Sequence, residues 1–213
     1  MFGEHELCAM IIVVEGPTAT GKSTWITRHC PPEVVVPEGE AGTAPKRSVE
    51  AEAAAHFWAG YNASRWALAL ESEQRYGTAV CDTDPFKLHY VWCLWQTGHA
   101  DHGQWRAELR ANRSYFAKGR HGFADLVLVE VPDRSTLETR RDADRSRKRA
   151  NFDLHVEMAE PLRQWYAALG RLEPSRVRWE LPATGLRGLK PDPRQPRCGV
   201  ELFDAFIDQL PAR

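Results

Sequence analysis

The feature that most constrains this chain is a glycine-bounded loop that follows the first apolar segment. Residues 11–14 are Ile-Ile-Val-Val, and after one further residue the loop reads Gly16-Pro17-Thr18-Ala19-Thr20-Gly21-Lys22-Ser23. In the pattern GxxxxGK[ST], the glycines let the backbone curl until several N–H groups point inward at the amino end of a helix. Phosphate groups bind such a turn, because the helix terminus leaves those N–H groups without intrahelical partners. The sequence therefore predicts a buried strand, a phosphate-binding loop and a helix, in that order.

The residue types in this loop indicate a nucleotide and a divalent cation as ligands. Lys22 is expected to reach the terminal phosphates, and the Ser23 hydroxyl to ligate a magnesium ion that bridges them. A glycine-rich turn that binds no nucleotide is the alternative. We expect ATP and Mg²⁺ as cofactors, and the sequence leaves open whether ATP or GTP is the donor. The expected nucleotide-binding residues are Gly16, Thr18, Ala19, Thr20, Gly21, Lys22, Ser23 and Thr24.

Short β-branched segments alternate with longer helical patterns along the chain. This alternation is typical of a parallel sheet covered by helices on both faces. We therefore predict a single α/β domain over residues 1–213, of the P-loop NTPase type, with three αβα layers around a five-stranded parallel sheet. The predicted strands are 11–14, 34–36, 78–81, 125–131 and 177–181, and the predicted helices are 21–29, 48–76, one capped by Asp84, 105–118, one beginning at Pro132-Asp133, 152–169 and 201–210.

Charge and hydropathy exclude several classes of partner. Lys and Arg number 28 against 29 Asp and Glu, for a formal net charge of -1. Such a balance does not indicate a nucleic-acid partner, which needs an excess of cations. The longest apolar run, residues 8–14, is far shorter than the roughly 20 residues of a membrane span. No secretory signal pattern is visible, so we expect a cytoplasmic protein without a membrane or nucleic-acid partner.

Acidic residues follow two other predicted strands, and arginines follow a third. Pro37-Glu38-Gly39-Glu40 comes after strand 34–36, and Asp82 comes after strand 78–81. After strand 125–131, a helix runs into Arg140, Arg145 and Arg147. With the opening strand and loop, this order resembles that of thymidylate kinases and deoxynucleoside kinases over most of the chain. The resemblance implies an ATP-dependent kinase with a nucleoside or nucleotide acceptor, and a helical, arginine-rich lid at about residues 140–152.

The resemblance also implies roles for side chains outside the loop. Glu38 is expected to orient the acceptor hydroxyl, with Glu40 as the alternate, and Asp82 to hold magnesium with Ser23; which of these carboxylates acts as the base stays open. Arginines of the lid are expected to clamp the transferring phosphoryl group. The predicted catalytic residues are therefore Lys22, Glu38, Asp82, Arg141, Arg145 and Arg147.

The acceptor is less defined than the donor. The family has arginine directly after the acidic residue of the third strand, whereas this chain has Thr83, and Lys87 is the predicted substitute cation. Tyr61 and Arg65, on the long helix, are predicted to contact the acceptor, with core packing as the alternative. Two other functions stay open: a phosphotransferase acting on another hydroxyl-bearing metabolite or antibiotic, and a nucleotide-dependent regulatory ATPase. The sequence also leaves open whether two chains pair through the long helix.

Overall fold

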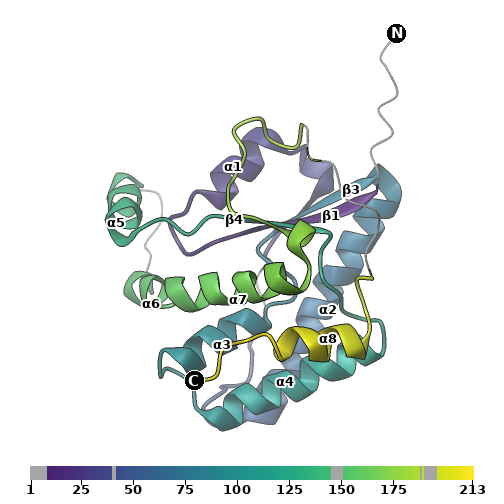
Figure 1. The fold of residues 1–213 in the computed structure, drawn as a ribbon, viewed down its shortest axis with the longest axis vertical. Coiled ribbons are helices and arrows are strands. Elements are labelled where there is room, and N and C mark those ends of the chain that lie inside the picture. The colour runs from purple at the N-terminus through teal and green to yellow at the C-terminus, as the bar shows by residue number, and fades with distance from the viewer. Residues whose placement is uncertain (1–8, 40–41, 145–150, 188, 190–195) are drawn as a thin grey trace.

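A computed structural model describes residues 9–39, 42–144, 151–187, 189 and 196–213, and its centre is a five-stranded sheet (Figure 1). The strands are all parallel and follow the order β2-β3-β1-β4-β5. They are β1 (Met10–Glu15), β2 (Val35–Val36), β3 (Thr78–Asp82), β4 (Leu126–Val129) and β5 (Val177–Arg178). The predicted α/β class with a five-stranded parallel sheet is confirmed, although β2, β4 and β5 are shorter than predicted.

Helices cover both faces of the sheet. Figure 1 shows α1 on one face and α2 and α7 on the other, with α3, α4 and α8 packed behind them. The helices are α1 (Lys22–His29), α2 (Ala51–Tyr76), α3 (Leu88–Gln96), α4 (His102–Ala117), α5 (Arg134–Ala143), α6 (Phe152–Glu157), α7 (Ala159–Leu172) and α8 (Val200–Ile207). Short 3₁₀ turns at Pro32–Val34 and Pro174–Arg176 precede β2 and β5.

The central strand β1 is buried on both of its faces. Ile12 packs in the apolar cluster that contains Trp25 of α1. Ile11, which points to the opposite face, packs in the larger cluster that contains Trp66 of α2 and Trp165 of α7. A strand covered on both faces reads as a continuous apolar run rather than an alternating one. This burial explains why β1 was the clearest strand in the sequence.

Two helices begin at other residues than predicted. Helix α3 starts at Leu88. The Asp84 carboxylate instead accepts a hydrogen bond of 2.8 Å from the Phe86 N–H, which closes a local turn rather than capping the helix. Helix α4 starts earlier than predicted, because Asp101 and Gln104 form a capping box at its amino end.

The predicted helix over residues 152–169 is divided into α6 and α7 at Met158. Pro161 has no N–H to donate to the Glu157 carbonyl, so the helical hydrogen-bond ladder is interrupted at this point. Met158 itself is buried at the joint. Residues on both sides of the division, His155 of α6 and Leu162 of α7, line the cavity described below.

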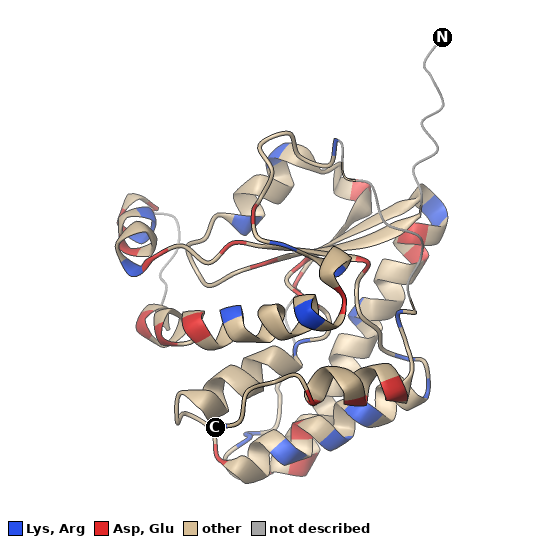
Figure 2. Cartoon of the chain, viewed as in Figure 1, with Lys and Arg blue, Asp and Glu red and all other residues tan. Residues whose placement is uncertain are grey.

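Acidic and basic residues are interspersed on the surface helices. Figure 2 shows both signs on α4, α5 and α7. Arg113 of α4, for example, pairs with Asp204 of α8 at 2.7 Å. Such exposed pairs contribute little to stability. Among the described residues, none of the helices combines the length and the apolar character that a membrane span requires.

Candidate functional site

The glycine loop, residues 16–24, joins the end of β1 to the first turn of α1. Gly16 has a φ of +155° and Gly21, the residue that precedes α1, a φ of +101°. A side chain at Gly16 would also collide with the carbonyl oxygen of Glu130. Only glycine combines these backbone angles with so close an approach. The order of strand, loop and helix that the pattern predicts is therefore present.

The loop borders a cavity of about 420 Å³. Every residue predicted to bind the nucleotide lines it, from Gly16 to Thr24. Glu38, which follows β2, Asp82, the last residue of β3, and Lys87, which follows β3, line the same cavity. The carboxyl ends of parallel strands meet at one edge of a sheet, which is why residues so distant in sequence converge here.

Ser23 and Asp82 contact each other across the sheet edge. The Ser23 hydroxyl donates to Asp82 Oδ2 at 3.0 Å. Burial raises the pKa of Asp82, and the hydrogen bond from Ser23 and the charge of Lys22 oppose that rise. A hydroxyl and a carboxylate at one point of a cavity wall are the hard oxygen ligands that Mg²⁺ prefers. The donor set therefore fits a magnesium ion.

The Lys22 ammonium lies against the loop that precedes it. Its Nζ donates to the carbonyl oxygens of Gly16 and Pro17. The positive charge of Lys22 is thus held close to the N–H groups of the loop and of the α1 terminus. The charge and the N–H groups together favour an anion with several oxygens, such as a phosphate chain.

Glu38 and Lys87 form an ion pair at the rim of the cavity. The Glu38 side chain is 50% exposed, so this pair is open to solvent. Tyr61 holds the backbone of this pair, because its hydroxyl donates to the Glu38 carbonyl oxygen at 2.9 Å. The predicted acceptor carboxylate and the predicted substitute cation are therefore neighbours. Glu40, the alternate carboxylate, lies outside the described residues.

Arg65 has backbone partners instead of a place on the cavity wall. It is 4% exposed, and its guanidinium donates to the carbonyl oxygens of Pro37 at 3.1 Å, Asp82 at 2.8 Å and Thr83 at 3.1 Å. Neither Arg65 nor Tyr61 lines the cavity. Arg65 ties the segment after β2 to the turn after β3, and contact of either residue with an acceptor stays a prediction.

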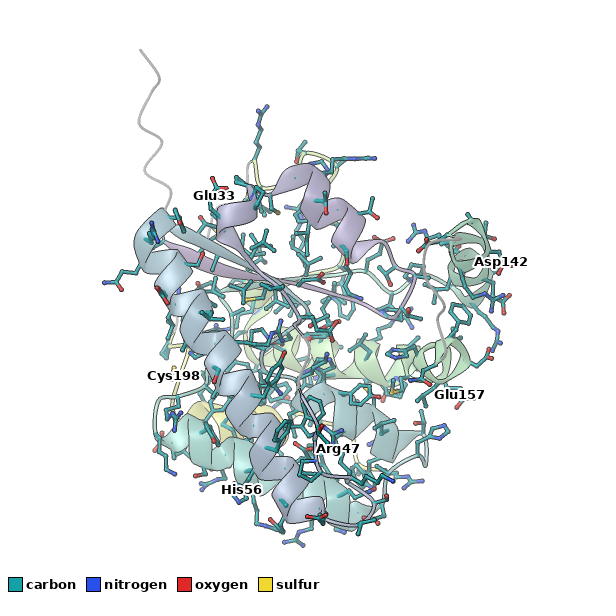
Figure 3. The ribbon with its side chains drawn as sticks, turned by 180° about the vertical axis from the view of Figure 1, so that it is seen from behind. Glu33, Arg47, His56, Asp142, Glu157 and Cys198 are labelled. Carbon is teal, nitrogen blue, oxygen red and sulfur yellow. The ribbon has the colours of Figure 1, made fainter. Side chains whose placement is uncertain are left out.

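The arginines predicted to form a clamp are only partly described. Arg141 donates to Asp142 at 2.8 Å and stacks on Phe152, its guanidinium 4.3 Å from the ring centre. It does not line the cavity, and Figure 3 shows Asp142 at the outer side of α5. Arg145 and Arg147 lie outside the described residues.

Arg140, which was named in the predicted lid but not among the predicted catalytic residues, is an arginine of α5 that reaches the loop. Its guanidinium donates to the Thr20 carbonyl and to Glu130 at 3.2 Å. The basic run at 140–149 indicated this region, but its spacing could not distinguish the face of α5 that turns toward the loop from the face occupied by Arg141.

A buried acidic pair, Glu15 and Asp84, lies at the cavity, and Glu15 is part of the cavity wall. Glu15 accepts from the N–H groups of Gly16 at 2.8 Å and Asp84 at 3.0 Å. Burial alone would raise the pKa of Glu15, but His89, Lys22 and those two N–H groups outweigh it and lower the pKa. Burial, together with the charge of Glu15, raises the pKa of Asp84 to about 7. Glu15 is therefore the ionised member of the pair, and Asp84 receives a hydrogen bond of 3.1 Å from Tyr166.

Part of the cavity wall has no counterpart among the predicted residues. It is formed by Tyr90 and Cys93 of α3 together with His155, Met158 and Leu162 from the α6–α7 region, and the rings of Tyr90 and His155 lie 6.2 Å apart. Burial and the charge of Lys22 lower the pKa of His155. Helical spacing alone gave no signal for them, since the same spacing fits core packing. Glu15 did carry a signal, because it is an acid at the end of an otherwise apolar strand.

No protein-family model matches this chain, and no curated protein matches it significantly.

Proposed function

We propose that this chain is a P-loop, ATP-dependent phosphotransferase that transfers the γ-phosphate to a hydroxyl group of a nucleoside or nucleotide. The observation that carries the proposal is the hydrogen bond between Ser23 and Asp82. The loop pattern alone indicates phosphate binding. A carboxylate from another strand on the same serine completes a magnesium-binding pair and separates this loop from a glycine-rich turn of purely structural use.

The cavity residues divide the chemistry between them. The loop N–H groups and Lys22 hold the phosphate chain, and Ser23 and Asp82 hold Mg²⁺, which neutralises phosphate charge when bound. The acceptor hydroxyl loses its proton to Glu38 as its oxygen bonds to the γ-phosphorus, while the bond from that phosphorus to the β–γ bridging oxygen breaks and ADP leaves. Glu38 lines the same cavity as the loop, as an acceptor-side base must.

The segment at 140–152 forms the proposed lid. Arg140 already contacts the loop through Thr20, and Asp144, at the end of α5, lines the cavity. A basic segment that closes on the phosphates would exclude water that otherwise hydrolyses ATP. Arg145 and Arg147 are proposed to act in that closed state.

A second acceptor class is favoured by one observation. The residue after Asp82 is Thr83, not the arginine typical of nucleoside and nucleotide kinases. The nearby Arg65 donates its Nε and Nη2 hydrogen bonds to backbone carbonyls. The cation on the acceptor side, Lys87, is paired with Glu38. A different hydroxyl-bearing metabolite or antibiotic therefore remains the alternative acceptor.

The test is ADP release by the purified protein with ATP and Mg²⁺, with and without nucleosides, nucleoside monophosphates and hydroxylated antibiotics. We expect at least one acceptor to stimulate ADP release, and Lys22→Ala to abolish that stimulation without a change in the circular dichroism spectrum. Lys118→Ala, an exposed lysine at the end of α4, is the matched control and should retain activity. Slow ATP hydrolysis that no acceptor stimulates would favour a regulatory ATPase instead, and full activity of Lys22→Ala would exclude the proposed mechanism.

A further inference from the structure

The turn after β3 holds a β-branched residue in an unusual backbone conformation. Thr83 has a φ of +65°. Residues other than glycine rarely adopt this region, and for a β-branched side chain it is a true outlier. Such strain persists only where the surrounding structure imposes it, and it concentrates at functional sites.

The structure around Thr83 does impose it. The Thr83 N–H donates to the Val14 carbonyl at 3.2 Å, and its carbonyl accepts from Arg65 at 3.1 Å. The next N–H, that of Asp84, donates to Glu15 at 3.0 Å, and the Asp82 carbonyl accepts from Arg65 at 2.8 Å. The turn is therefore fastened on both sides by buried, charged side chains.

The side chain that this turn presents is polar and unpaired. Thr83 is 7% exposed and lines the cavity, yet its hydroxyl is buried without a hydrogen-bond partner in the described part of the chain. A buried hydroxyl without a partner destabilises the fold, and a valine would fill the same volume without that cost. Because Thr83 is part of the cavity wall, a molecule bound there can approach this side chain.

The charges nearby define what such a hydroxyl would bind. Two carboxylates of the cavity wall adjoin this turn: Asp82 is the preceding residue, and Glu15 accepts from the N–H of the following residue, Asp84. They disfavour an anionic group next to Thr83 and favour a hydrogen-bond donor, such as an O–H or N–H group. We propose that Thr83 is a specificity-determining residue whose hydroxyl accepts a hydrogen bond from an uncharged O–H or N–H group of the acceptor. The inference rests on the proposed phosphotransferase function.

The test compares two substitutions at this position. Thr83→Val keeps the branched shape and removes the hydroxyl, whereas Thr83→Ser keeps the hydroxyl. The probes are adenosine, thymidine, thymidine monophosphate and chloramphenicol. Phosphoryl transfer is measured as ADP release, binding is measured by calorimetry with a non-hydrolysable ATP analogue present, and stability is measured by urea unfolding. Thr78→Val, at the opposite end of β3 and away from the cavity, is the matched control.

We expect Thr83→Val to lower kcat/KM for the best acceptor by about 10- to 100-fold, because the donor group of the acceptor would lose its partner. The kcat/KM of Thr83→Ser should stay close to that of the wild type. The free energy of unfolding of Thr83→Val should be at least as large as that of the wild type. This combination separates acceptor recognition from a structural role, since a structural hydroxyl would make stability and activity fall together.

The other outcomes each decide the matter. Unchanged kcat/KM in Thr83→Val overturns the inference and leaves the proposed function standing, and so does a parallel loss of stability and activity. If a probe binds the wild type without transfer, the proposed function fails, and the affinity of Thr83→Val for that probe decides the role of Thr83. A wild type that neither binds nor phosphorylates any probe overturns both.

Discussion

The sharpest quantitative consequence of this structure concerns Asp84, a carboxylic acid that is 6% exposed. Its pKa rises from an ordinary 3.8 to about 7, through burial and the nearby charge of Glu15. Asp84→Asn keeps an oxygen that can accept from the Phe86 N–H. It removes the charge, so the substitution isolates the cost of ionising this buried group.

The sign follows from proton linkage. The folded state binds the Asp84 proton more tightly than the unfolded state, so this group stabilises the fold fully below pH 3.8, and the stabilisation is lost as the pH rises to about 7. Each pH unit in that window corresponds to about 1.4 kcal/mol, which gives an upper value of about 4 kcal/mol. The wild type should lose that much free energy of unfolding relative to Asp84→Asn between pH 4 and pH 8.

The assay is urea unfolding of both proteins at intervals of pH from 4 to 8. Titrating groups that do not interact with Asp84 are common to the two proteins, so the difference between the two free energies reports Asp84 together with its coupling to Glu15. Asp133→Asn is the control, because Asp133 also accepts from a backbone N–H, that of Thr136, but is exposed. Hydrogen bonds lower its pKa, so any contribution changes with pH in the opposite direction. A difference between Asp84→Asn and wild type that stays constant with pH would refute the reasoning.

Three further substitutions test the site. Asp82→Asn should raise the Mg²⁺ concentration that gives half-maximal activity by about tenfold or more, because the carboxylate bonded to Ser23 loses its charge; an unchanged Mg²⁺ titration would count against this pair. Arg65→Met should lower the free energy of unfolding by about 3 kcal/mol or more in urea, because three backbone carbonyls lose their donor; wild-type stability would contradict the proposed tie. Glu38→Gln should lower turnover far more than ATP affinity in a steady-state assay. The control Glu33→Gln, whose residue precedes β2 at its other end (Figure 3), should have the turnover of the wild type. Equal turnover in the two variants would assign the role of the base to another carboxylate.

Local patterns were sufficient for the elements that are specified locally. The β1 strand and the glycine loop could be recognised because an apolar run buried on both faces and a fixed glycine spacing are properties of consecutive residues. The same holds for the parallel sheet, which follows from the alternation of strands and helices. Even the convergence of Glu38 and Asp82 on the loop could be anticipated, since both follow parallel strands.

Only the tertiary structure decided how the rest of the site is arranged. The part of the cavity wall that includes Tyr90 and His155 depends on how α3 packs against the α6–α7 region, and helical spacing cannot specify that packing. Arg65 illustrates the same limit, because its Nε and Nη2 donate to three backbone carbonyls that come from two distant segments. The sequence by itself determined the glycine loop and the sheet behind it, through local backbone geometry and burial. The strained turn at Thr83 and the faces of Arg140 and Arg141 were decided by long-range packing, which no local pattern encodes.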